Sequence, residues 1–294
     1  MSYNKEKIMA LTGVNALSLN HDELAELFSE VLKKPMHGLC FSPYVEGQQP
    51  GEQLSEEQIR RRMEIIQPHT QWIRSFSCTE GNEMIPAIAK EFGLKTLVGA
   101  WLGKDKKINE QEVTNLIQMA QAGQVDIAVV GNEVMYRGDL TEDELLGYIN
   151  RVKGALPNIP VGYVDAYYEF EFRTKITEAC DVILANCYPF WEGCAIEYSL
   201  LYMKDMYARA QKAAKGKKVI ITETGWPNKG EKFHGAQPSR KNAMTYFLNT
   251  QQWSQEDDID IFYFSSFDES WKIASEGDVG PYWGIWGIDE KLKY

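Results

Sequence analysis

The sequence predicts a (β/α)8 barrel in a single domain, and three observations lead to this fold. Short apolar runs recur about every 30 residues, and segments with helical periodicity alternate with them. Chains of roughly 250 residues commonly form such a barrel as one unit, and this chain has 294 residues. Near-continuous apolar runs bounded by Gly, Pro, Asn or charged residues are typical of buried parallel strands.

Eight runs fit this pattern of a buried parallel strand. The expected strands are His37–Tyr44, Thr70–Ser77, Leu94–Trp101, Val125–Gly131, Ile159–Asp165, Val182–Tyr188, Lys217–Glu223 and Ile259–Phe267.

The segments between these strands place apolar residues at three- and four-residue intervals, as amphipathic helices do. Thr141 and Glu144 have the spacing of a capping box and mark a helix start. An additional helix is expected before the first strand, so residues 1–36 form a helical extension and the barrel begins at about residue 37. No linker divides residues 1–294. The expected helices are Leu19–Leu32, Ser55–Ile66, Glu110–Ala122, Thr141–Val152, Ser199–Ala214 and Ser239–Trp253.

A doubly wound open sheet is the alternative fold for alternating strands and helices. That fold carries a glycine-rich phosphate-binding turn after its first strand. The segment Ser42–Gln48 contains neither G-x-G-x-x-G nor a P-loop. The closed barrel is therefore the better prediction.

The formal net charge of −11 argues against nucleic acid and anionic membrane surfaces as partners. The charge suits a neutral ligand. Residues 1–20 show no convincing signal peptide, and the five cysteines lack a disulfide or zinc spacing. We expect reduced cysteines, a monomer and a cytoplasmic location, with a periplasmic or secreted location as the alternative if a leader was removed.

No cofactor or metal is expected. The four histidines lack the spacing of a zinc or iron site. The G-x-S-x-G motif of serine hydrolases is also absent.

Two glutamates at strand ends are the candidate catalytic residues. Glu133 follows the fourth expected strand and Glu223 ends the seventh, and barrel enzymes carry their chemistry at the C-terminal ends of strands. Glu133 alone also fits a surface turn. Glu223 ends an apolar run in which an unpaired carboxylate is costly to bury. Glycoside hydrolysis usually needs two carboxyl groups that flank the scissile bond, and two glutamates across one barrel mouth meet this requirement.

Tryptophan placement independently favours a sugar ligand. Six of the eight tryptophans fall at or beyond expected strand ends, where flat indole faces suit the apolar faces of β-linked glucose. We expect about half of the six to pack the top of the barrel instead, because each Trp must bury a large apolar area. The six are Trp101, Trp191, Trp226, Trp271, Trp283 and Trp286.

Several blocks resemble the signatures of glycoside hydrolase family 17, which contains β-1,3-glucanases and β-1,3-glucan transglycosylases on a (β/α)8 barrel. The resemblance spans nearly the whole chain from the first strand onward. The blocks are Ile73-Arg74, Gly131-Asn132-Glu133, Asn186–Phe190, Ile221–Pro227, Phe267–Lys272 and Trp283–Gly287.

The resemblance implies that Glu133 is the acid/base and Glu223 the nucleophile of a retaining enzyme. It implies that Asn132 binds the sugar 2-hydroxyl, that Arg74 and Tyr188 orient the nucleophile, and that Glu269 and Lys272 lie near the substrate. The long insertions of the plant members are absent, which puts a long endo-acting groove in doubt. Further candidate substrate-binding residues are Tyr44, Tyr136, Asp165 and Trp226.

Three functions remain open at this point. The first is a retaining hydrolase of β-1,3-glucan or its oligosaccharides, and the second is a β-1,3-glucanosyltransferase that uses the same two glutamates. The third is a barrel that binds glucan without turning it over.

Overall fold

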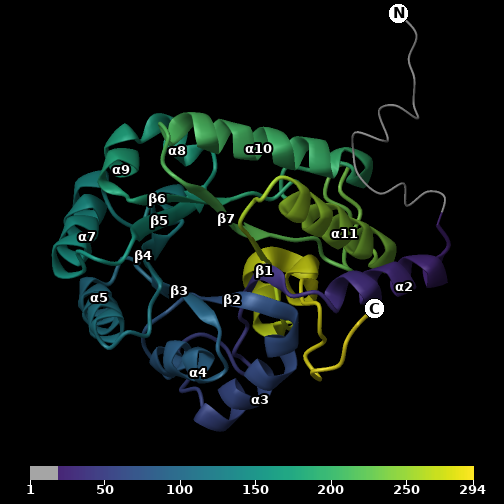
Figure 1. Cartoon of the computed structure of the whole chain (residues 1–294), viewed down its shortest axis with the longest axis horizontal. Coiled ribbons are helices and arrows are strands. Elements are labelled where there is room, and N and C mark those ends of the chain that lie inside the picture. The colour runs from purple at the N-terminus through teal and green to yellow at the C-terminus, as the bar shows by residue number, and fades with distance from the viewer. Residues whose placement is uncertain (1–18) are drawn as a thin grey trace, which may run out of the picture.

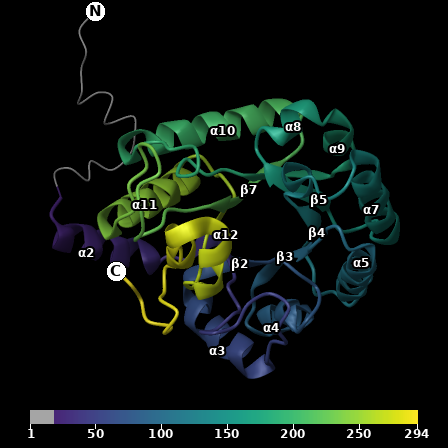
Figure 2. The same ribbon diagram turned by 180° about the vertical axis from the view of Figure 1, so that it is seen from behind.

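The computed structural model describes residues 19–294, which form a closed barrel of eight strands in the order β1 to β8. All neighbouring strands are parallel, including the closing pair β1 and β8. Helices surround the strands in both views of the molecule (Figures 1 and 2). The predicted (β/α)8 barrel is confirmed. Residues 1–18, which include part of the expected N-terminal extension and most of the segment in which a signal peptide was considered, lie outside the described residues.

Each strand overlaps one of the eight expected runs. The strands are β1 Met36–Cys40, β2 Thr70–Ser75, β3 Lys95–Ala100, β4 Ile127–Asn132, β5 Val161–Ala166, β6 Val182–Asn186, β7 Val219–Thr224 and β8 Ile261–Tyr263.

The last strand is much shorter than the expected run Ile259–Phe267. Beyond Tyr263 the backbone leaves the regular ladder but still donates hydrogen bonds to both neighbours. Phe264 N–H binds the Thr224 carbonyl at 2.7 Å, and Ser266 N–H binds the Cys40 carbonyl at 3.0 Å. The apolar run therefore continues into the mouth of the barrel as irregular chain that is hydrogen-bonded to β7 and β1.

Helices occupy the segments between the strands, before β1 and after β8. The α-helices are α2 His21–Leu32, α3 Glu56–Ile66, α4 Ile85–Glu91, α5 Lys106–Gln121, α6 Val134–Arg137, α7 Glu142–Ala155, α8 Glu169–Phe172, α9 Thr174–Ala179, α10 Ser199–Ala213, α11 Arg240–Glu256 and α12 Ile273–Glu276. The 3-10 helices are η1 Gln67–His69, η2 Asn82–Met84, η3 Ile196–Tyr198, η4 Ser270–Lys272 and η5 Gly277–Tyr282.

Caps explain where the long helices begin. The Thr141 side chain accepts from the Glu144 N–H and the Glu144 side chain accepts from the Thr141 N–H, so the predicted capping box is present at α7. Helix α5 begins at Lys106, four residues before the expected start, because the Asp105 carboxylate accepts the N–H groups of Lys107 and Ile108.

The helix before the first strand is part of the barrel domain. In α2, Leu24, Phe28 and Leu32 are buried. The Phe28 ring lies 4.6 Å from that of Phe247 in α11 and 4.8 Å from that of Tyr294 at the C-terminus. Both views place α2 beside α11 (Figures 1 and 2). Within residues 19–294, no helix combines the length and the apolarity that a membrane span requires.

Candidate active site

Glu223 lies near the C-terminal end of β7, where it is 7 % exposed. Its carboxylate accepts a hydrogen bond from Arg74 Nη1 at 2.5 Å and one from the Tyr188 hydroxyl at 2.8 Å. These two donors come from β2 and from the loop after β6, so two separate elements fix the direction of the carboxylate. A carboxylate that is paired with a guanidinium and hydrogen-bonded to a hydroxyl in this way is held in one orientation.

Arg74 on β2 links Glu223 on β7 to Asn132 on β4. Its guanidinium is buried and also donates to the Thr222 carbonyl at 3.0 Å and to Asn132 Oδ1 at 2.8 Å. The planar group lies 4.3 Å from the ring centroid of Phe76. Arg74 therefore holds Glu223 and Asn132 in one rigid arrangement, as a planar fork of donors does.

Glu133 follows β4 in an unusual backbone conformation. Its φ of 51° lies in the left-handed region, which a residue with a side chain adopts at a cost of about 1–2 kcal/mol. The register between β4 and β5 shifts just before it, between Val129 and Asn132. Irregularities of this kind turn a side chain away from its regular direction. The backbone thus directs Glu133 toward Asn186 and the site.

Asn186 at the end of β6 connects the two glutamates. Its Nδ2 donates to Glu133 Oε1 at 2.8 Å and to Glu223 Oε1 at 3.2 Å, so these two oxygens are at most about 6 Å apart. Its Oδ1 accepts from the Thr222 hydroxyl at 2.9 Å, which fixes the direction of the amide. Retaining glycosidases have carboxyls roughly 5–5.5 Å apart and inverting ones roughly 6.5–9.5 Å apart. The arrangement is that of a retaining enzyme.

Burial, and after it the negative charge of Glu223, raise the pKa of Glu133 to about 7. Asp165 also raises this pKa, whereas the Asn186 hydrogen bond and the charge of Arg137 lower it. Glu133 is thus protonated below neutral pH while Glu223 has a cationic partner. Two carboxyls in different environments provide an acid and a base in one site.

The raised pKa of Glu133 predicts the alkaline limb of the pH–rate profile. A general acid must be protonated, so kcat/KM is expected to fall as pH rises through about 7. Initial rates measured between pH 4 and pH 9 on one substrate test this. A rate that stays constant up to pH 9 would contradict the role of Glu133 as the acid.

Glu269 and Lys272 form a buried ion pair after β8, with Lys272 Nζ 2.8 Å from Glu269 Oε2. The ammonium also lies 4.0 Å from the ring centroid of Phe264. Nearby, Trp271 Nε1 donates to Glu269 Oε1 at 3.4 Å, and the Tyr44 ring meets the Trp271 ring edge-on at 6.1 Å. The predicted residues Tyr44, Glu269 and Lys272 therefore belong to one cluster beside the mouth.

The tryptophans divide into buried and accessible residues. Trp283 and Trp286 are 3 % and 4 % exposed, whereas Trp101 is 40 % exposed and its indole stacks with Arg137. Trp226 is only 1 % exposed, packs against Phe190 and donates its indole N–H to the Gln237 carbonyl at 3.0 Å. The prediction that Trp226 binds substrate is corrected: it is a core residue.

Tyr136 and Asp165 occupy opposite environments. Tyr136 is 60 % exposed on α6, three residues after Glu133, and its predicted contact with substrate stays a prediction. Asp165 is fully buried at the end of β5, and both of its oxygens accept hydrogen bonds from protein groups. The predicted substrate contact of Asp165 is therefore corrected, because its carboxylate has no exposed surface that a sugar could reach.

Asn186 was not among the candidate site residues. Its position at the end of β6, two residues before Tyr188, was a signal of the same kind as the one that pointed to Glu133.

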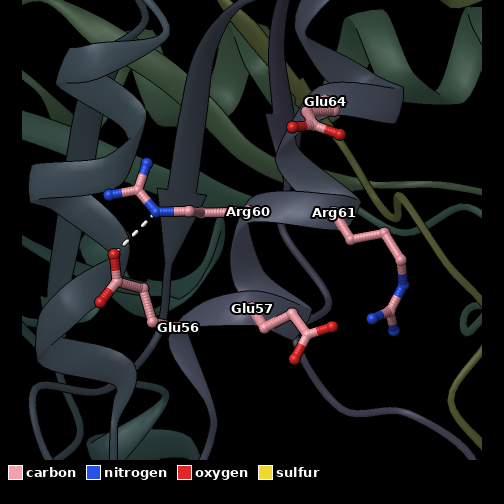
Figure 3. A pocket seen from close by; sticks show the side chains of 5 residues that line it. All are labelled: Glu56, Glu57, Arg60, Arg61 and Glu64. Carbon is pink, nitrogen blue, oxygen red and sulfur yellow. Dashed lines mark hydrogen bonds and ion pairs between the residues drawn. The ribbon is translucent and has the colours of Figure 1, made fainter.

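A shallow surface hollow lies away from the two glutamates. It is on the outer face of α3 and is lined by Glu56, Glu57, Arg60, Arg61 and Glu64 (Figure 3). Opposite charges alternate there, and Arg60 pairs with Glu56 at 2.7 Å. The two glutamates of the barrel mouth do not line this hollow.

A (β/α)8 barrel with two glutamates at its strand ends, one with a raised pKa and one buried and paired with arginine, defines a retaining glycoside hydrolase. The comparisons with known proteins agree. The model of the BtgE/BtgC glycoside hydrolase domain matches residues 38–284. The chain belongs to this family, within glycoside hydrolase family 17.

Relatives and solved structures share most of the chain. A glucan 1,3-beta-glucosidase of Arthroderma benhamiae is 29 % identical over 266 residues, covering 83 % of this chain and 85 % of the relative. The family 17 β-1,3-glucanosyltransferase of Rhizomucor miehei superposes with a TM-score of 0.79 at 28 % identity, covering 88 % of this chain and 95 % of that one. An active-site mutant of the Rhizomucor enzyme, in complex with laminaritriose, gives a TM-score of 0.78 at 27 % identity over the same shares.

Proposed function

We propose that the protein hydrolyses β-1,3-glucan or its oligosaccharides by double displacement, with Glu223 as nucleophile and Glu133 as acid/base. The position of Asn186 Nδ2 within hydrogen-bonding distance of both carboxylates carries this proposal. The separation suits attack on the anomeric carbon from one side and protonation of the leaving oxygen from the other. The names of the relatives supply the substrate class.

In the first step Glu223 attacks the anomeric carbon and Glu133 donates its proton to the departing glycosidic oxygen. Forming the covalent ester removes the negative charge of Glu223. That charge is one of the causes that raise the pKa of Glu133, so the pKa falls once the glycosyl-enzyme has formed. Glu133 then accepts a proton from water, which releases the sugar with retained configuration.

A β-1,3-glucanosyltransferase is the second candidate function. The same glycosyl-enzyme is released to a sugar hydroxyl instead of water, and Glu133 accepts the proton of that hydroxyl. The similarity to the Rhizomucor miehei β-1,3-glucanosyltransferase favours this candidate. The exposed rings of Trp101 and Tyr136 beside the mouth offer surfaces on which an acceptor sugar can stack.

Incubation with laminarin and with β-1,3-linked gluco-oligosaccharides, followed by chromatography, separates the candidates. Hydrolysis predicts only products shorter than the substrate. Transfer predicts a ladder that extends above the length of the input oligosaccharide, most strongly at high substrate concentration. Unchanged substrates would contradict both, and tight binding without turnover would indicate a glucan-binding barrel.

A further inference from the structure

Asp165 and its neighbour Tyr163 are buried polar groups for which the double-displacement mechanism has no role. Asp165 is fully buried and Tyr163 is 1 % exposed, both on β5. The Tyr163 hydroxyl donates to Asp165 Oδ2. A buried carboxylate is costly to maintain and calls for a purpose or a partner.

Both groups bind the backbone that immediately follows Glu133. The Tyr163 hydroxyl accepts from Met135 N–H at 2.9 Å, and Asp165 Oδ2 accepts from Tyr136 N–H at 3.3 Å. The preceding peptide is bound as well, because Glu133 N–H donates to the Val164 carbonyl at 2.8 Å. Three consecutive residues of β5 therefore hold the chain on both sides of the Glu133 Cα.

This set of bonds explains how Glu133 keeps its left-handed backbone. A non-glycine residue stays in that region only when the surrounding structure fixes it there. The N–H groups of Met135 and Tyr136 are among the donors at the start of α6 that have no partner within the helix. Bonds from two side chains of β5 satisfy them and fix the peptide planes next to Glu133.

We propose that Asp165 and Tyr163 are positioning residues for Glu133, because they bind the two N–H groups that follow it and so hold its carboxyl against Asn186 and Glu223. This inference rests on the acid/base role of Glu133 proposed above. A misplacement of about 1 Å in a catalytic group costs about 100-fold in rate.

The negative charge of Asp165 also supports the role of Glu133 as an acid. It raises the pKa of Glu133, together with burial and the charge of Glu223 on β7, against the Asn186 hydrogen bond and the charge of Arg137. Burial raises the pKa of Asp165 to about 6, a value to which the negative charge of Glu169 on α8 also contributes and which the hydrogen bond from the Tyr163 hydroxyl holds down. Above pH 6 the carboxylate is thus mainly ionised and favours the protonated form of Glu133.

The variants Asp165→Asn and Tyr163→Phe test the proposal. An asparagine must turn its NH2 group toward either the Ala166 N–H or the Tyr136 N–H, both of which need an acceptor. Phenylalanine removes only the hydroxyl that binds Met135 N–H, and this variant carries the test if Asp165→Asn does not fold. Asp126→Asn is the matched control. Asp126 lies just before β4, at the opposite end of the barrel from the two glutamates, and its carboxylate also accepts a backbone hydrogen bond, from Thr96 N–H.

Two substrates distinguish positioning from general damage to the fold. A β-1,3-gluco-oligosaccharide needs a proton on its leaving group, and 2,4-dinitrophenyl β-laminaribioside does not. We expect both variants to lose about 10-fold to 100-fold in kcat/KM on the oligosaccharide and less than about 3-fold on the aryl glycoside. Asp165→Asn should also shift the alkaline limb to lower pH, because it removes one of the negative charges that raise the pKa of Glu133. Asp126→Asn should show only a small decrease in kcat/KM, of similar size on both substrates.

Equal losses on the two substrates, or no loss in either variant, would overturn the positioning role. Glu133→Ala, measured alongside, separates this failure from that of the proposed mechanism. If Glu133→Ala itself lowers kcat/KM equally on both substrates, the acid/base assignment is wrong. If Glu133→Ala is selective and the two β5 variants are not, only the inference about Asp165 and Tyr163 falls.

Discussion

Glu223→Gln is expected to lower turnover of β-1,3-gluco-oligosaccharides on the order of 10⁴-fold or more, because the amide cannot form the glycosyl ester. The fold should persist. The amide oxygen still accepts from Arg74, and the Tyr188 hydroxyl can turn to accept from the amide nitrogen. Binding of laminaritriose, measured by calorimetry, should give a Kd within about tenfold of the wild-type KM.

The control for this substitution is Glu64→Gln, on the exposed face of α3 (Figure 3). It makes the same chemical change far from the barrel mouth and should leave turnover unchanged. Wild-type activity in Glu223→Gln would end the proposed mechanism. Loss of both turnover and binding would point to a disrupted site instead of a missing nucleophile.

Glu133→Ala is expected to lower kcat/KM on oligosaccharides by about 10²–10⁴-fold, the usual contribution of a general acid. On 2,4-dinitrophenyl β-laminaribioside kcat/KM should be largely kept, because dinitrophenolate leaves without a proton, whereas kcat should fall. The glycosyl-enzyme should then accumulate, since no base activates water. Added azide needs no base and should restore turnover with formation of a β-glycosyl azide.

Product analysis by NMR identifies the azide and its configuration. An α-glycosyl azide would mean that the enzyme inverts, and the absence of rescue would mean that Glu133 is not the base of the second step. Glu269→Gln is a useful comparison. It removes another buried carboxylate beside the mouth, which is paired with Lys272, and it should show no azide rescue.

The barrel was predictable because each of its strands is buried on both sides and therefore reads as a continuous apolar run. Strand β7, Val219–Thr224, is buried throughout. The run expected from the sequence ended at Glu223, one residue before the end of the strand. The short helices α4, α8 and α9 were not expected, because their 7, 4 and 6 residues are too few for a helical period to emerge. The capped helix α7 was predicted from a local motif.

The site was predictable where a residue's position on its strand decides its role. Arg74 and Tyr188 were expected to orient Glu223, and their hydrogen bonds to its carboxylate agree with that expectation. Trp226 and Asp165 also lie at or just after strand ends. The residues that contact them, however, come from distant parts of the chain, and these contacts decide that both side chains are buried. Trp226 is buried by Phe190 and its neighbours, and Asp165 is occupied by the backbone after Glu133. No local pattern carries such information.

The left-handed conformation of Glu133 is a further feature that the sequence does not reveal. It depends on Val164, Tyr163 and Asp165, some 30 residues further along the chain, and on the register shift between β4 and β5. Backbone conformations at functional sites often depend on such distant contacts and contradict local preference.

Trapping the covalent intermediate tests the central claim most directly. The protein would be incubated with 2,4-dinitrophenyl 2-deoxy-2-fluoro-β-laminaribioside, and its intact mass and proteolytic peptides would be measured. The double-displacement mechanism predicts one fluoroglycosyl group per chain, attached to Glu223 in the β7 peptide and absent from Glu223→Gln. A label on another residue, or an unlabelled protein that still cleaves β-1,3-glucan, would contradict it.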